Sequence, residues 1–178
     1  MCIRDRAVGD NEYIDFHARR LVEMAGYRIE RKIDDWYDQD GLRSKHNNDF
    51  MRDPSFCKAY ERGCRADYDH KNRWRVYIGL WAAFTASKLA GDFVECGVNR
   101  GVLSSAIMEF LDWDSLNKTF YLLDTFEGLD PRYVSPEDLQ CGVLERSRSW
   151  LEDGQYVRGV ESVKVNFSQW KNLSLIHI

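Results

Sequence analysis

The spacing of apolar residues predicts a helical first part of the chain. Between residues 12 and 31 apolar side chains recur weakly at helical intervals, and the polar stretch over residues 34–53 then predicts an exposed connection or flap. Asp53 as N-cap, Pro54 at the first helical position and Gly63 near the end predict a short helix. We therefore expect helices before residue 71.

The most regular helical pattern covers residues 72–89. Apolar side chains return there every three or four residues, which predicts that one face packs against the rest of the domain. The members of this predicted face are Trp74, Ile78, Trp81, Ala82, Thr85 and Leu89.

The period changes after residue 91. Residues 92–96 predict a short strand, residues 102–111 predict a helix, and the apolar run 118–124 predicts an inner parallel strand that is covered on both faces. This order is a βαβ unit with a right-handed crossover. Two further helical stretches follow, one ending near residue 152 and one over residues 159–170.

This pattern predicts an α/β fold. We expect the N-terminal part of a Rossmann-like, doubly wound parallel sheet, preceded by a helical N-terminal extension.

The turn after the first predicted strand is the strongest candidate site. In an open parallel sheet, ligands bind at the carboxyl ends of the strands, where backbone N–H groups and a helix N-terminus converge. Gly97 and Gly101 bracket this turn and allow a ligand to approach its backbone. A phosphate-binding P-loop is excluded, because the turn does not end in Gly-Lys-Ser/Thr. A dinucleotide fingerprint needs a glycine where Asn99 stands.

An acidic residue before this turn favours a ligand with a positive group. Glu95 takes that place, and Asp124 ends the second predicted strand. S-adenosylmethionine has an ammonium, a sulfonium and no phosphate, and a carboxylate at position 124 can accept hydrogen bonds from both ribose hydroxyls. Arg100 is a candidate partner for the methionine carboxylate, and Phe126 is a candidate neighbour of the adenine.

Each of these residues also has a plain structural explanation. Glu95 can cap its own turn, Asp124 can cap the following helix, and Arg100 can be a solvated loop charge. Their joint placement at successive strand ends favours the cofactor site.

The motifs "GDFVECGVNRG" and "FYLLDTFEGL" resemble those of the macrocin O-methyltransferase family, which consists of class I methyltransferases. The resemblance covers residues 74–129 well and 159–172 loosely. Asn99 replaces a common aromatic residue and Thr125 a common serine, and these changes affect the inferred substrate more than the cofactor.

The resemblance implies S-adenosylmethionine as cofactor, with a cofactor site made of Glu95, Gly97, Asn99, Arg100, Gly101, Asp124, Thr125 and Phe126. It also implies a magnesium ion that positions and acidifies a sugar hydroxyl. The magnesium ligands and the catalytic base are expected after Asn172, so no catalytic residue is assigned.

Composition and charge limit the classes of binding partner that we expect. A formal net charge of −4, or −5 without the first six residues, gives no reason to expect nucleic acid or a membrane surface as partner. The expected partner is a small hydroxylated acceptor molecule, and homo-oligomerisation is left open. Four cysteines, Cys57, Cys64, Cys96 and Cys141, lack metal-site spacing and are expected as reduced thiols in a cytoplasmic protein.

The two ends of the chain resemble the product of a DNA adapter. "LSLIHI" can be encoded by a run whose reverse complement, read in another frame, encodes "MCIRD" followed by Arg or Ser. We therefore expect adapter-derived tags at residues 1–6 and 173–178, a helical extension at 7–71, and the first part of a methyltransferase domain at 72–172.

The leading hypothesis is an S-adenosylmethionine-dependent O-methyltransferase, with the chain carrying the cofactor half and inactive by itself. Two alternatives are an NAD-dependent enzyme that uses the same βαβ unit and a non-catalytic Rossmann-like binding module.

Overall fold

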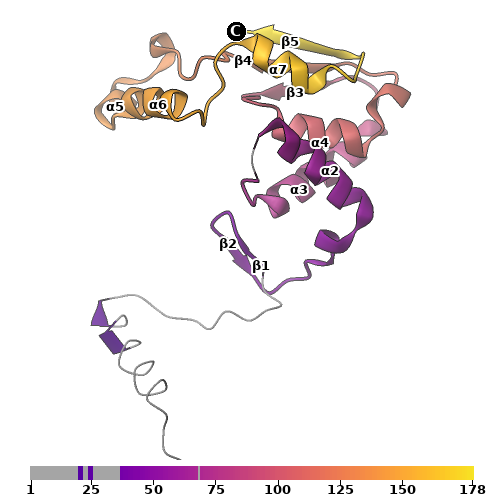
Figure 1. Cartoon of the computed structure of the whole chain (residues 1–178), viewed down its shortest axis with the longest axis horizontal. Helices are drawn as coiled ribbons and strands as arrows, with labels where there is room; N and C mark the ends of the chain where they lie inside the picture. The colour runs from indigo at the N-terminus through magenta and orange to yellow at the C-terminus, as the bar shows by residue number, and fades with distance from the viewer. Residues whose placement is uncertain (1–19, 22–23, 26–36, 68) are drawn as a thin grey trace, which may run out of the picture.

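The computed structural model describes residues 20–21, 24–25, 37–67 and 69–178 (Figure 1). The predicted tag at residues 1–6 and most of the helix predicted over residues 12–31 lie outside the described residues.

The segment predicted to be an exposed connection contains a β-hairpin instead. Strands β1 (Tyr37–Gln39) and β2 (Leu42–Ser44) pair antiparallel, and the 3-10 helix η1 (Asp49–Arg52) follows. Asp40 and Gly41 both have positive φ, 53° and 70°, so "DG" makes the two-residue turn that favours hairpins. Tyr37 is only 2% exposed, and its hydroxyl accepts a hydrogen bond from the backbone N–H of Trp74. The hairpin is thereby attached to the helical layer.

Helix α2 (Pro54–Ala66) begins where the sequence predicts. The carboxylate of Asp53 accepts a hydrogen bond from the backbone N–H of Phe56 at 2.8 Å, and Pro54 takes the first helical position. Gly63 lies near the end of this helix, as predicted, but it is not the residue that stops it, because the helix continues to Ala66. Gly63 instead lies where α2 crosses helix α4 (Val102–Phe110), and a Cβ there would be 2.6 Å from the carbonyl oxygen of Val102.

This crossing predicts that Gly63→Ala lowers the free energy of unfolding by about 2 kcal/mol, because backbone must move to admit the methyl group. Gly79→Ala is the matched control. A Cβ there would meet Leu103 Cδ1 at 2.7 Å, the end of a side chain that can turn away. The gain in helix propensity of about 1 kcal/mol offsets that contact, so we expect a nearly neutral change. Urea denaturation of both variants measures the difference, and equal costs would contradict the backbone explanation.

Helix α3 (Arg73–Ser87) forms as predicted, but the predicted packing face is wrong. The buried residues are Val76, Leu80 and Ala83, whereas Trp81 is 62% exposed. The other predicted members are exposed too, except the half-buried Trp74; they are Ile78, Ala82, Thr85 and Leu89. The helix is apolar on nearly all sides, so its periodicity does not select the face that meets α4.

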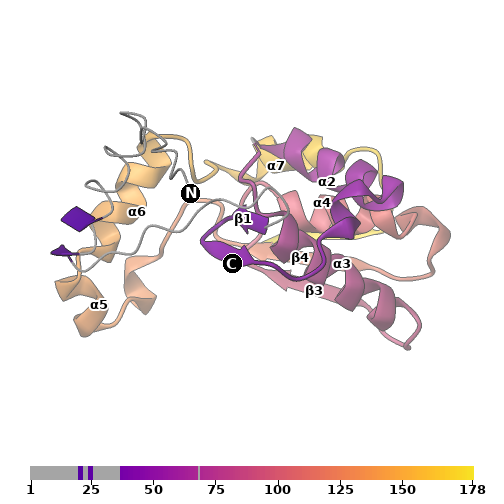
Figure 2. The same ribbon diagram turned by 90° about the horizontal axis from the view of Figure 1, so that it is seen from below.

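The sheet has three parallel strands in the order β3-β4-β5. They are β3 (Phe93–Cys96), β4 (Phe120–Asp124) and β5 (Leu173–His177), and α4 connects the first two while α7 (Val160–Phe167) precedes the third. The predicted βαβ unit and α/β class are confirmed. Helices α2, α3, α4 and α7 lie on the same side of the sheet (Figures 1 and 2).

Strand β4 is an inner strand, as predicted, but its two faces are not equally covered. Phe120 and Leu122 are 2% and 0% exposed and belong to the core with Phe167 of α7. The alternate residues Tyr121 and Leu123 are only half-buried, and the neighbouring Val94 is 63% exposed. The described helices therefore leave the second face of the sheet uncovered.

Strand β5 consists of residues predicted to be adapter-derived. It pairs in parallel with β4, with Leu175 opposite Leu122, and the N–H of Ile178 donates to the carbonyl oxygen of Asp124 at 3.0 Å. Apolar residues at alternate positions are sufficient for this pairing, and the adapter origin of the segment stays a prediction.

Residues between β4 and α7 form an arm to one side of the sheet, drawn at the left of Figure 1. It contains the 3-10 helix η3 (Pro131–Tyr133) and helices α5 (Pro136–Gln140) and α6 (Val143–Glu152). Before β4 in the chain, the 3-10 helix η2 (Trp113–Ser115) carries the fully buried Trp113, whose indole N–H donates to the carbonyl of Asn172 at 2.8 Å. None of the helices in the described part has the length and apolar character needed to cross a membrane.

Candidate functional site

The turn after β3 and the end of β4 meet at one edge of the sheet. The N–H of Gly97 continues the ladder to the carbonyl of Leu123 at 2.9 Å, after which the chain turns away from the sheet. Gly97, Asn99 and Gly101 all have positive φ, at 83°, 49° and 82°. Positive φ is readily adopted by glycine and tolerated by asparagine, which explains the residue types in this turn.

Asp124 joins the two turns. One of its carboxylate oxygens accepts a hydrogen bond from the N–H of Asn99 and the other from the N–H of Phe126, each at 2.7 Å. The oxygen that accepts from Phe126 also lies 3.4 Å from the Thr125 hydroxyl, whose shorter hydrogen bond is to the carbonyl of Gly128. A carboxylate oxygen can accept two hydrogen bonds, so a ligand hydroxyl can still be accommodated on each. Asp124 thus has a structural role and keeps acceptor capacity for a ligand.

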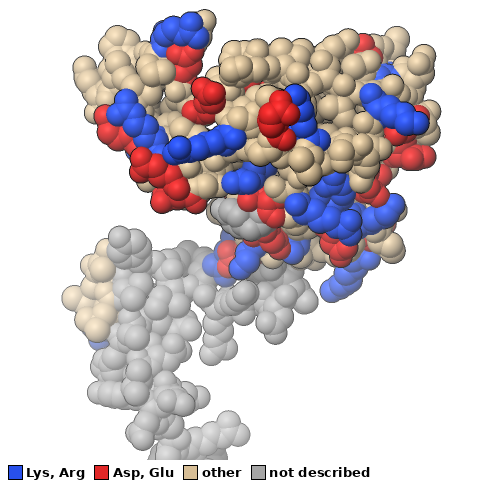
Figure 3. Space-filling view, turned by 45° about the horizontal axis from the view of Figure 1, so that its top comes forward, with Lys and Arg blue, Asp and Glu red and all other residues tan. Residues whose placement is uncertain are grey.

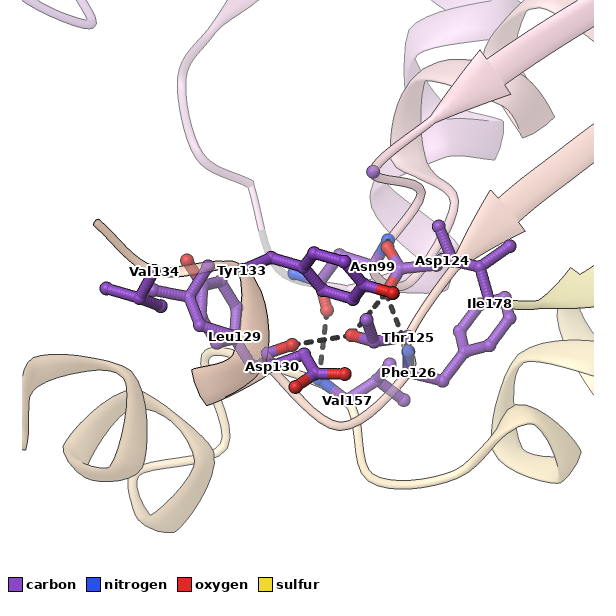
Figure 4. A pocket seen from close by; sticks show the side chains of 13 residues that line it. Asn99, Asp124, Thr125, Phe126, Leu129, Asp130, Tyr133, Val134, Val157 and Ile178 are labelled. Carbon is purple, nitrogen blue, oxygen red and sulfur yellow. Dashed lines mark hydrogen bonds between the residues drawn. The ribbon is translucent and has the colours of Figure 1, made fainter. Parts of the chain in front are cut away.

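A pocket of about 420 Å³ opens at this edge (Figure 4). Its walls come from the two turns, the loop after β4, the segment after α6 and the end of β5. The lining residues are Gly97, Asn99, Asp124, Thr125, Phe126, Gly128, Leu129, Asp130, Tyr133, Val134, Tyr156, Val157 and Ile178.

The structure brings most of the predicted cofactor residues together in this pocket, namely Gly97, Asn99, Asp124, Thr125 and Phe126. Phe126 is 1% exposed and has φ of 51°, while the Thr125 hydroxyl donates to the carbonyl of Gly128 at 2.5 Å. These contacts hold the loop after β4 in a tight curve that forms the floor of the pocket.

Three predicted residues, Glu95, Arg100 and Gly101, do not line the pocket. Arg100 donates to the carbonyl of Gly154 at 2.6 Å, and its Nε lies 3.5 Å from an oxygen of Asp67. Gly101 is buried beneath the ring of Phe167. Their roles in cofactor binding stay predictions.

Glu95 lies on the covered face of β3, and its Oε2 is buried without a hydrogen-bond partner. Burial raises the pKa of Glu95, the nearby Ser104 hydroxyl lowers it in part, and the charge of Asp124 raises it, so that the pKa is about 7. Near neutral pH this carboxyl group is therefore poised between its charged and neutral forms.

Sequence reasoning missed the residues that complete the pocket. Leu129, Tyr133 and Val134 lie in a loop whose turn residues gave no signal for a ligand. Tyr156 and Val157 are far from the turn in sequence, and hydrogen bonds between distant segments bring them there, among them that of the Val157 N–H to Asn99 Oδ1 at 2.9 Å.

Charge is mixed on one face of the molecule. On the face drawn in Figure 3, acidic and basic side chains alternate without a field of one sign.

Among the residues that the structure describes, no group of three or more His, Cys, Asp or Glu side chains can hold a metal ion. The magnesium ligands therefore stay a prediction.

Comparisons with known proteins give a likeness among solved structures. No protein-family model matches the chain. No curated protein matches it either. A solved structure described as "Structure of the O-methyltransferase NovP" aligns with 57% of this chain and 43% of its own, at 20% identity and a TM-score of 0.44. The chain thus spans less than half the length of that protein, and a likeness of this degree assigns no function.

Proposed function

We propose that the protein is an S-adenosylmethionine-dependent methyltransferase that methylates a hydroxyl group of a small hydroxylated or sugar-bearing molecule. The observation that carries this proposal is the carboxylate of Asp124, which lies in the pocket at the end of β4 with acceptor capacity on both oxygens. A carboxylate in this position suits the two adjacent hydroxyls of a ribose.

The chemistry of the pocket walls supports a nucleoside without phosphates. Its lining residues include aromatic and aliphatic side chains and two carboxylates, Asp124 and Asp130, but no Lys or Arg among the described residues. A bound phosphate would lack a cationic partner there, whereas an adenine could pack against apolar side chains.

Glu95 suits the positive end of the same cofactor. Glu95 is the next-to-last residue of β3, just before the turn, and its Oε2 is buried without a hydrogen-bond partner. An ammonium group beside it would supply the missing hydrogen bonds and the opposite charge. The cofactor supplies the methyl group, and the residues of this chain hold and orient it. The methyl acceptor, and the magnesium ion implied by the family resemblance, have no assigned ligands among the described residues.

Titration calorimetry with S-adenosylhomocysteine tests the proposal. We expect the unaltered chain to bind it, and Asp124→Ala to weaken binding by a factor of about 30, because a bidentate charge-assisted contact is lost. Asp124→Asn is a second variant that keeps the shape of the side chain, and melting curves show whether each variant is folded.

Asp130→Ala is the matched control. Asp130 also lines the pocket, but its carboxylate pairs with the exposed Arg132, so we expect little change in affinity. Tight binding by a folded Asp124→Ala variant would remove the ribose assignment. Binding of NAD without any binding of S-adenosylhomocysteine would overturn the proposed function.

A further inference from the structure

The side chain of Asn99 is occupied by the backbone of a distant segment. Its Oδ1 accepts the N–H of Val157 at 2.9 Å, and its Nδ2 donates to the carbonyl of Gln155 at 3.0 Å. One side-chain amide thus pairs with a backbone N–H and a backbone carbonyl of the connection between α6 and α7, as a neighbouring strand would.

Two more contacts attach the same connection to the turns. Arg100 donates to the carbonyl of Gly154, and the N–H of Gly159 donates to the carbonyl of Phe126 at 2.8 Å. Residues 154–159, which we call the wall segment, are therefore held at both ends by residues of the two candidate ligand turns.

The wall segment contributes directly to the pocket. Tyr156 and Val157 line it, and Val157 is 4% exposed. Tyr156 also packs edge-on against Trp150 of α6, with ring centroids 5.3 Å apart. Movement of the wall segment would therefore change the shape of the pocket and the position of the arm together.

We propose that Asn99 is a positioning residue, whose side-chain amide fixes the wall segment and so sets the affinity of the pocket without binding the ligand itself. Asparagine suits this role for two independent reasons. It tolerates the φ of 49° that the turn requires, and its amide presents a donor and an acceptor together. The effect on ligand affinity rests on the proposed function, whereas the effect on the wall segment does not.

Asn99→Gly isolates the side chain, because glycine keeps the positive φ and the N–H that donates to Asp124. We expect the amide hydrogen-exchange protection of Val157, measured by NMR, to fall about tenfold, since one hydrogen bond is lost. Protection of the sheet amides of Phe120 and Leu122 stays unchanged. The affinity for S-adenosylhomocysteine falls together with the protection of Val157, by a factor of about ten.

Two further variants make the test specific. Asn99→Asp keeps an acceptor for the Val157 N–H, so most of the lost protection returns. Asn166 lies on α7, and its side-chain amide donates to the carbonyl of Arg100 in the same turn at 3.1 Å. We expect Asn166→Ala to remove this contact and to leave the protection of Val157 unchanged.

Unchanged protection of Val157 in Asn99→Gly would overturn the positioning role. Lost protection with unchanged affinity would overturn its coupling to the ligand. If the unaltered chain binds no S-adenosylhomocysteine, the proposed function fails, and Val157 protection still decides the role of Asn99.

Discussion

Replacing Gly101 with alanine is expected to lower the free energy of unfolding by about 3 kcal/mol. The φ of 82° is costly for any residue with a Cβ, and a Cβ there would be 2.3 Å and 2.6 Å from two ring carbons of Phe167. Phe167 is 1% exposed and belongs to the core beneath the sheet, so its ring has no free space to enter. The methyl group would therefore strain the backbone and displace the core together.

Gly97→Ala separates these two costs. Gly97 has nearly the same φ, 83°, but nothing lies within 4 Å of a Cβ built there. We expect it to cost only the backbone strain, about 1 kcal/mol. Phe167→Leu in the Gly101→Ala background should recover part of the loss, because the ring atoms that clash are removed. Urea denaturation of the single and double variants measures these terms, and equal costs at the two glycines would show that packing against Phe167 is unimportant.

The strand–helix–strand unit was predictable because local signals and packing agree there. Residues 120–123 are apolar without interruption, and an inner parallel strand needs that composition. The turn before α4 combines glycines with an asparagine, and each of the three adopts the positive φ that such residues favour. The same signals placed Asp124 and Gly97 at one edge of the sheet.

Features that depend on tertiary contacts were not predictable from periodicity. Helix α3 is apolar on most sides, so only its contact with α4 decides that Leu80 is buried and Trp81 exposed. Gly63 was interpreted as a stop signal near the end of its helix, whereas it lies at a close crossing of two helices, which leaves no signal in the sequence of one. The hairpin at 37–44 had a signal in Asp40-Gly41, but its strands are too short for a clear alternation.

In the candidate site, too, some residues were predictable from local sequence signals and others were not. Residues on the two turns were found from local chemistry, whereas Tyr156 and Val157 enter the pocket through hydrogen bonds that join distant segments. Arg100 was expected to face a ligand, but the structure shows that it contacts Gly154 and Asp67. An arginine in a loop has many partners within reach, and its sequence position does not choose between them.

The second large effect concerns Glu95, whose replacement by glutamine is expected to stabilise the protein by about 3 kcal/mol at about pH 8 and to leave it unchanged at about pH 4. Burial raises the pKa of this carboxyl group from 4.5 to about 7 in the folded state. The folded state therefore holds its proton more tightly than the unfolded state. Stability due to this group is fully present below about pH 4.5 and is lost as the pH rises through about 7.

Glutamine removes the charge and keeps the size of the side chain. Its amide can donate to the hydroxyl oxygen of Ser104, which is buried without a hydrogen-bond partner. Glu161→Gln is the control, because Glu161 is exposed on α7 and pairs with Lys164. The free energy of unfolding is measured between about pH 4 and about pH 8. Over this range the unaltered chain should lose stability relative to Glu95→Gln. The Glu161→Gln control should follow the same curve as the unaltered chain. Parallel curves for Glu95→Gln and the unaltered chain would show that Glu95 keeps an ordinary pKa.

Ligand binding should show the opposite dependence on pH under the proposed function. An ammonium group beside Glu95 favours the charged carboxylate and lowers its pKa, so binding releases a proton near neutral pH. Affinity for S-adenosylhomocysteine then rises between about pH 6 and about pH 8, over the range in which the stability of the free protein falls. Calorimetry in buffers of different ionisation enthalpy measures the released proton directly. Glu95→Gln should abolish the release, and a release that persists in this variant would show that another group titrates on binding.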